Sequence, residues 1–173
     1  MANGFYKVGA DERKDQIVQI GYKNWLLIFG FFNDEVLGGY NWRKNYDHKP
    51  TNAELKTDLD WLVNSLTDEK ILSGFVWNGK HVWLSTENQM NYKAAYDLAV
   101  QTSGATLPVK FKLGEYENGD AVYHTFEELS EFTDFYTRAI AYVYDCLNEG
   151  WQEKDSIDYD SLLTDECAHR SQC

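Results

Sequence analysis

The stretch that most constrains the fold is residues 71–104, in which two short apolar segments flank an Asn-Gly pair and a helical pattern follows. Alternate residues of the first segment share one face of a predicted strand: Ile71, Ser73, Phe75 and Trp77. Asn78-Gly79 is the dipeptide that a tight type I′ turn favours, and the second strand continues through Val82 and Leu84. Thr86 and Gln89 have the spacing of a capping box, which predicts a helix over residues 87–102. The stretch therefore predicts a hairpin followed by a helix.

The same plan recurs further along the chain. Val109, Phe111 and Leu113 alternate, and Asn118-Gly119 provides a second turn. Thr125 and Glu128 form another capping-box pattern, so a third helix is predicted from Thr125 to Gly150. Apolar residues recur along it at helical spacing: Leu129, Phe132, Tyr136, Ile140, Val143 and Leu147.

The first part of the chain predicts two strands, a loop and a helix. Residues 16–21 and 25–32 have strand composition, and the second strand is apolar on both faces with Gly30 as a candidate bulge. Residues 33–49 are predicted to be a loop rich in aromatic rings. Thr51 and Glu54 form a capping box that starts a helix predicted to end near Thr67.

Together these patterns predict an α+β fold, with antiparallel hairpins in one sheet and three capped helices packed mainly on one face. Residues 16–152 are predicted to be a single domain, preceded by an N-terminal arm over residues 1–15. Residues 153–173 are predicted to be an acidic, mostly extended tail. Within that tail, Tyr159, Leu162 and Leu163 are either a short docking motif or simply part of the extended chain.

Charge and cysteine usage exclude several classes of protein. The net charge is −12, so a phosphate backbone or an anionic membrane would be repelled, and we expect no nucleic-acid or membrane partner. The three cysteines include two near the end of the chain, which is not the pattern of a secreted disulfide framework. Residues 1–15 are polar and lack the apolar core of a signal peptide. We therefore expect a protein made and folded in a reducing cytoplasm.

No motif in the chain predicts catalysis, a cofactor or a metal site. Residues 74–81 nearly match a phosphate-binding loop, but His81 stands where Ser or Thr must hold magnesium, and Asn78-Gly79 predicts a hairpin instead. Cys167, His169 and Cys173 lack a second ligand pair at a known zinc spacing. The four histidines are scattered, and none lies in a recognisable catalytic pattern. We therefore expect no enzyme.

Aromatic residues make up 16% of the chain, which is high for a small core. Large rings are enriched at protein interfaces, because they bury much area at little entropic cost. The residues predicted to lie nearest interfaces are Tyr40, Trp42, Tyr46, Trp77, Trp83 and Trp151. The alternative is that these rings fill the core, and Trp77 and Trp83 in particular lie on predicted hairpin strands.

Several phrases, in this order, resemble an uncharacterised domain found in small proteins of bacteriophages and of prophages of gut bacteria. They span residues 46–51, 71–79, 83–89, 107–111 and 147–152, beginning with Tyr46-Asp47-His48-Lys49-Pro50-Thr51. The resemblance extends from Tyr40 to Asp158, about two thirds of the chain. Relatives of this kind tend to be encoded among tail and tail-fibre genes.

What the resemblance implies is a non-enzymatic structural protein of the phage particle, in the tail or neck region, that acts through protein–protein contacts. Its expected partners are other phage structural proteins of the tail, neck or fibre, and a homo-oligomer is a further expectation. The expected location is the virion, after synthesis in the cytoplasm of the bacterial host. The alternatives are a tail-fibre assembly chaperone that is not retained in the particle, and an enzyme acting on host glycans or peptides.

Overall fold

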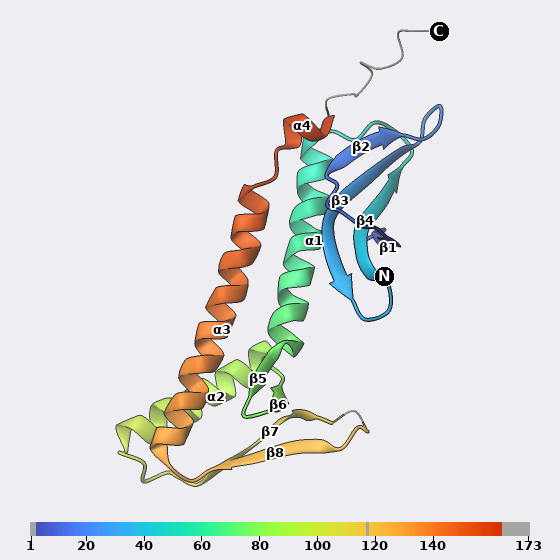
Figure 1. The fold of residues 1–173 in the computed structure, drawn as a ribbon. Coiled ribbons are helices and arrows are strands. Elements are labelled where there is room, and N and C mark those ends of the chain that lie inside the picture. The colour runs from blue at the N-terminus through green and yellow to red at the C-terminus, as the bar shows by residue number, and fades with distance from the viewer. Residues whose placement is uncertain (1–2, 117, 164–173) are drawn as a thin grey trace. The chain divides into compact units, whose positions relative to one another are not determined.

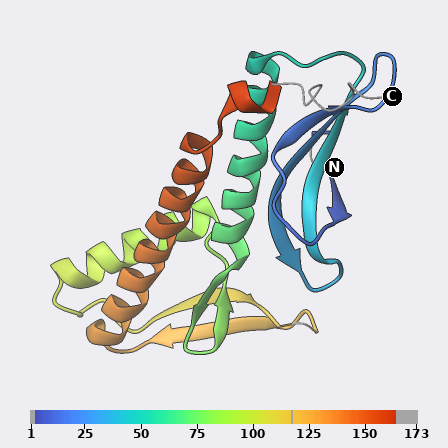
Figure 2. The same ribbon diagram turned by 45° about the horizontal axis from the view of Figure 1, so that its top comes forward.

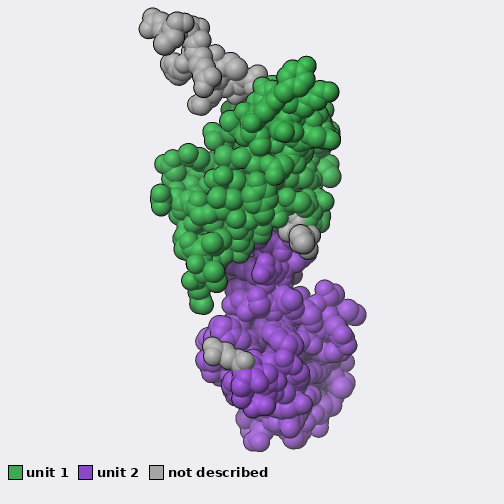
Figure 3. All heavy atoms as spheres, turned by 90° about the vertical axis from the view of Figure 1, so that its right-hand side faces the viewer, with its two compact units in different colours: residues 1–63, 154–173 green, residues 64–153 purple. Residues whose placement is uncertain are grey.

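A computed structural model describes residues 3–116 and 118–163, and it confirms the predicted α+β class (Figure 1). The strands are antiparallel and form a four-stranded sheet and two separate two-stranded sheets, instead of the one sheet expected. The chain divides into two compact units: unit 1 contains residues 1–63 and 154–173, and unit 2 contains residues 64–153 (Figure 3). Both boundaries fall inside helices, α1 (Asn52–Ser73) and α3 (Leu129–Asp155), and the predicted domain boundaries stay a prediction.

Unit 1 is built on the four-stranded sheet, whose strand order is β1-β4-β3-β2. The strands are β1 (Tyr6–Gly9), β2 (Gln16–Gln19), β3 (Trp25–Asp34) and β4 (Gly38–Tyr46). Two expectations were wrong here. The predicted N-terminal arm contains β1, which pairs with β4, and the predicted ring-rich loop contains β4 itself.

The bulge predicted at Gly30 is confirmed. The register between β3 and β4 shifts between Phe29 and Phe32, and Gly30 has a φ of 71°, a conformation that residues with a Cβ rarely adopt. Beyond the bulge Phe32 stacks on Tyr40, so the shift keeps large rings paired across the two strands.

The first turns of α1 pack on this sheet through both apolar and polar contacts. Leu55, Leu59 and Leu62 are fully buried. Asp58 lies among them, and its carboxylate accepts hydrogen bonds from the Lys44 ammonium (2.6 Å) and the Tyr46 hydroxyl (2.7 Å) of β4. A buried charge is tolerated only when it is paired in this way, so these two bonds fix the register of α1 on the sheet.

The end of the described chain differs from the extended tail predicted for residues 153–173. Helix α3 continues to Asp155, and α4 (Tyr159–Leu163) follows it. Leu162 is buried and α4 lies against β2. The segment that contains Tyr159, Leu162 and Leu163 therefore packs within unit 1. Cys167, His169 and Cys173 lie outside the described residues.

Unit 2 contains two hairpins and the helices that flank them (Figure 2). The first hairpin joins β5 (Phe75–Trp77) to β6 (Lys80–Val82), and the second joins β7 (Val109–Glu115) to β8 (Ala121–Phe126). Asn78 and Gly79 both have positive φ, 48° and 73°, which confirms the predicted type I′ turn. Helix α2 (Thr86–Gln101) lies between the hairpins in sequence. Its N-cap is Ser85, one residue before the predicted Thr86.

Two predicted boundaries in unit 2 were wrong. Ile71 and Ser73 belong to the end of α1, which continues past the predicted end near Thr67 and stops before Gly74. Thr125 lies in β8 and does not cap α3, which begins at Leu129. Strand pairing between β7 and β8 outweighs the local capping pattern at that position.

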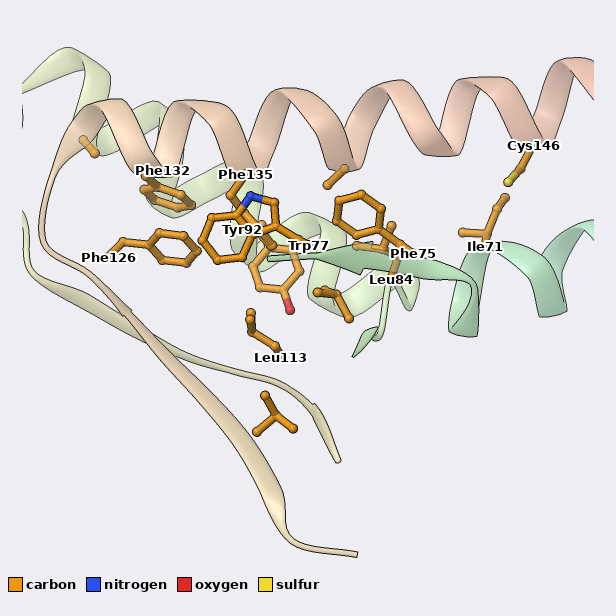
Figure 4. Packing of buried hydrophobic residues seen from close by; sticks show 14 residues of the cluster. Ile71, Phe75, Trp77, Leu84, Tyr92, Leu113, Phe126, Phe132, Phe135 and Cys146 are labelled. Carbon is orange, nitrogen blue, oxygen red and sulfur yellow. The ribbon is translucent and has the colours of Figure 1, made fainter. Parts of the chain in front are cut away.

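The core of unit 2 is largely aromatic (Figure 4). Trp77, Phe126 and Phe135 come from different elements and contact one another with ring centroids 5.0–5.6 Å apart. Cys146 is buried beside Ile71, so this thiol packs as a small apolar side chain. The rigid core holds the hairpins on which the candidate site lies.

Candidate functional site

The candidate site is an open groove of about 810 Å³ on the hairpins of unit 2. We call it the hairpin groove, and define it by its lining residues: Ser73, Gly79, Lys80, His81, Trp83, Glu115, Tyr116, Asn118 and Val122. Two large rings line it, Trp83 with 38% of its surface exposed and Tyr116 with 57% exposed. An open concave surface with accessible aromatic rings can bind a partner that brings apolar groups of its own.

The groove exists because the two hairpins meet closely at one point. The Trp83 amide donates to the Leu113 carbonyl across the hairpins (2.7 Å), at a bulge between Lys112 and Gly114. Gly114 makes this approach feasible, since a Cβ added there would lie 2.9 Å from the backbone oxygen of His81. The absence of a side chain at Gly114 therefore allows the two hairpins to approach each other closely.

Charged side chains surround the rings. The Lys112 ammonium lies 5.6 Å from the centre of the Trp83 ring and also pairs with Glu115 at 2.6 Å. Cation–π contacts of this kind hold an exposed indole in one orientation. Lys112 therefore pairs with the Glu115 carboxylate at the rim of the groove. The same ammonium group holds the Trp83 ring in place.

Behind the groove, Lys80, His124 and Glu131 form a continuous hydrogen-bonded chain. Lys80 Nζ lies 3.1 Å from His124 Nδ1, and His124 Nε2 lies 3.0 Å from a Glu131 oxygen. An ammonium group can only donate, so Nδ1 is the acceptor and Nε2 carries the proton that is donated to Glu131. The ring of His124 is therefore neutral in this arrangement.

Helix α3 carries a second polar contact about one turn after Glu131. Trp77 donates its indole N–H to Asp134 (3.0 Å), and this hydrogen bond is the main cause that lowers the pKa of the Asp134 carboxyl. Arg138 pairs with the other oxygen of Asp134 at 2.8 Å. Trp77 and His124 are in edge contact, so the two polar anchors share one aromatic wall.

The structure places the six predicted interface residues in four environments. Tyr40, Trp42 and Trp77 are buried, and Tyr46 is partly buried with its hydroxyl on Asp58. Trp83 lies in the hairpin groove, and Trp151 is 52% exposed on α3. Tyr40 and Trp42 are in edge contact with each other. An interface role for each of these residues stays a prediction.

The sequence analysis missed Lys80, His124, Glu131 and Tyr116. Lys80 is far from His124 and Glu131 in sequence, and the three side chains meet only through the topology of unit 2. Tyr116 could have been found, because it stands next to the predicted Asn118-Gly119 turn, where a large ring has little core to enter.

Among residues 3–116 and 118–163, no group of three His, Cys, Asp or Glu side chains could hold a metal ion. Over the same ranges, none of the helices has both the length and the apolar character required to cross a bilayer.

The fold and the groove define an α+β protein that presents aromatic rings in an open groove with charged side chains at its rim. Residues 54–168 match the family described as Domain of unknown function (DUF4376), and the chain belongs to that family. The matched range contains every residue of the hairpin groove and the Lys80–His124–Glu131 chain, whereas β1 to β4 precede it. No curated protein and no solved structure matches the chain.

Proposed function

We propose that this protein is a non-enzymatic structural component of bacteriophage particles, in the tail or neck region, that acts through protein–protein contacts. The observation that carries the proposal is the pair of exposed rings in the hairpin groove, Trp83 and Tyr116. Large rings that remain accessible are the usual anchors of protein interfaces, where they dominate the binding energy.

The phage assignment is supported by the resemblance of residues 40–158 to small phage and prophage proteins. Its proposed partners are other structural proteins of the tail, neck or fibre, and a second copy of the chain is a further candidate. The acidic character of the chain favours such partners over nucleic acid or anionic membrane.

Quantitative mass spectrometry of gradient-purified particles, beside the crude lysate from which they came, tests this proposal. We expect a fixed number of copies per particle. If the protein is abundant in the lysate and absent from the particles, the structural proposal is wrong and the fibre-assembly chaperone takes its place.

The chaperone has its own positive test. Co-expression with a neighbouring fibre gene would then convert insoluble fibre protein into soluble trimer. A structural component would leave the solubility of the fibre unchanged.

A further inference from the structure

Lys80, His124 and Glu131 join three elements, in addition to the hydrogen bond from Trp77 of β5 to Asp134 of α3. Lys80 belongs to β6, His124 to β8 and Glu131 to α3. The two hydrogen bonds of His124, 3.1 Å to Lys80 and 3.0 Å to Glu131, run from the first hairpin through the second hairpin to the helix. Lys80 also lines the hairpin groove, so the chain ends at the candidate site.

The arrangement requires a neutral imidazole. The Lys80 ammonium needs the lone pair on Nδ1, and protonation of the ring would replace that lone pair with an N–H group. Two positive charges would then stand 3.1 Å apart and the hydrogen bond would be lost, whereas the contact with Glu131 would become an ion pair. The two partners of His124 therefore respond in opposite ways to protonation of the ring: the Lys80 contact is lost and the Glu131 contact is strengthened.

The surroundings of His124 hold the ring in place while this happens. Its edge contacts are with Trp77 (centroids 5.0 Å apart) and Phe126 (4.6 Å), both buried. Phe111 is its partner across the β7–β8 pair. The charged groups that face this wall are Lys80 from β6 and Glu131 from α3. Asp134 lies about one turn further along the helix and Arg138 about two turns further. Because the ring cannot swing away, the Lys80 side chain is the member that must move.

We propose that His124 is the centre of a pH-sensitive latch, which fastens the β5–β6 hairpin to β8 and α3 while the ring is neutral and releases Lys80 into the hairpin groove when the ring is protonated. Histidine is the side chain whose charge changes most readily in mildly acidic solution. The latch is a property of unit 2 and does not depend on the proposed role in a phage particle.

Amide hydrogen exchange of residues 75–82 tests the latch, measured as protection factors at about pH 7.5 and about pH 5.5, where histidine titrates. Loss of one hydrogen bond corresponds to a fall in protection of about two- to tenfold at the lower pH. In His124→Gln the side-chain amide can still accept from Lys80 and donate to Glu131 but cannot take up a proton, so the fall should disappear.

His81→Gln is the matched control. His81 lies on β6 beside Lys80, is exposed in the hairpin groove, and does not take part in the latch. This variant should show the same fall as the wild-type protein. The latch is wrong if protection in the wild-type protein does not change with pH, if His124→Gln shows the wild-type fall, or if His81→Gln abolishes it.

A spectroscopic measurement on the unmodified protein stands independently of any variant. The ¹⁵N shifts of the His124 ring at neutral pH should show a proton on Nε2 and a lone pair on Nδ1. The opposite tautomer would overturn the proposal, even if His124→Gln failed to fold.

Discussion

Trp42 and Trp151 are expected to differ greatly in what they contribute to the free energy of unfolding. Trp42 is buried in unit 1, in edge contact with Tyr40 at 5.8 Å and with the Lys7 ammonium 5.5 Å from its ring centre. Trp151 is exposed on α3 in unit 2. Burial decides what truncation costs, because a buried ring loses its contacts and leaves a cavity.

We expect Trp42→Ala to lower the free energy of unfolding by about 3–5 kcal/mol. The lower end applies, because the indole nitrogen of Trp42 is buried without a hydrogen-bond partner among the described residues. Trp151→Ala, the matched control, should change stability by about 0.5 kcal/mol or less. Urea unfolding measures both, and equal effects of the two substitutions would contradict the placement of these rings.

At the scale of elements, the junction between the two hairpins depends on Gly114. Gly114→Ala would place a Cβ 2.9 Å from a backbone oxygen that cannot rotate away. We expect a loss of about 1–3 kcal/mol from overpacking, measured by urea unfolding.

Gly9→Ala serves as the control for that substitution. Gly9 also lies in a strand, and a Cβ there would meet its nearest neighbour at 4.0 Å, an ordinary contact. If both variants are equally stable, the close approach of β6 and β7 is not a constraint.

The start of α1 predicts a dependence of stability on pH. The Glu54 carboxylate accepts from the Thr51 amide and hydroxyl, each at 2.9 Å, and these bonds lower its pKa to about 2 from an ordinary value of 4.5. A lowered pKa means that the contribution is present above about pH 4.5 and is lost as the pH falls towards 2. Glu54→Gln keeps the capping geometry without the charge, so its unfolding midpoint should fall less steeply in acid.

At the same helix start, the contribution of His48 to stability depends on pH in the opposite direction. Hydrogen bonds to Asp47 and then Glu54 raise the pKa of His48 above 6.5. The stability that this contributes is present below pH 6.5 and is lost as the pH rises through the raised pKa. Unfolding midpoints from pH 6 to 8 should therefore fall in the wild-type protein and stay level in His48→Gln; identical profiles would contradict this contact.

Local sequence patterns predicted which helices, strands and turns are present better than they predicted the residues at which these elements begin and end. The Thr51 cap, the Asn78-Gly79 turn and the Gly30 bulge each depend on neighbours in sequence, and all three are confirmed. Strand β4 was predicted as a loop, although Tyr40, Trp42 and Tyr46 already alternate with polar residues. Its β-structure depends on pairing with β1 and β3, which no local signal specifies.

At the scale of the whole molecule, the candidate site could not be predicted from the sequence. Trp83 was expected at an interface, and it does line the hairpin groove, but the groove itself depends on how β6 meets β7. Nothing in the sequence distinguishes Lys80 and Glu131 from other charged residues, and only the fold places His124 between them. Side chains that act together across long sequence separations are visible only in the structure.

The most direct test of the central claim is the number of copies per purified particle in the wild-type protein and two tyrosine variants. Tyr116→Ala removes an exposed ring of the hairpin groove, and Tyr22→Ala removes a ring that is 92% exposed elsewhere. We predict that Tyr116→Ala lowers the copy number several-fold while Tyr22→Ala leaves it unchanged. Equal copy numbers in all three, or no wild-type protein in the particles, would contradict the account.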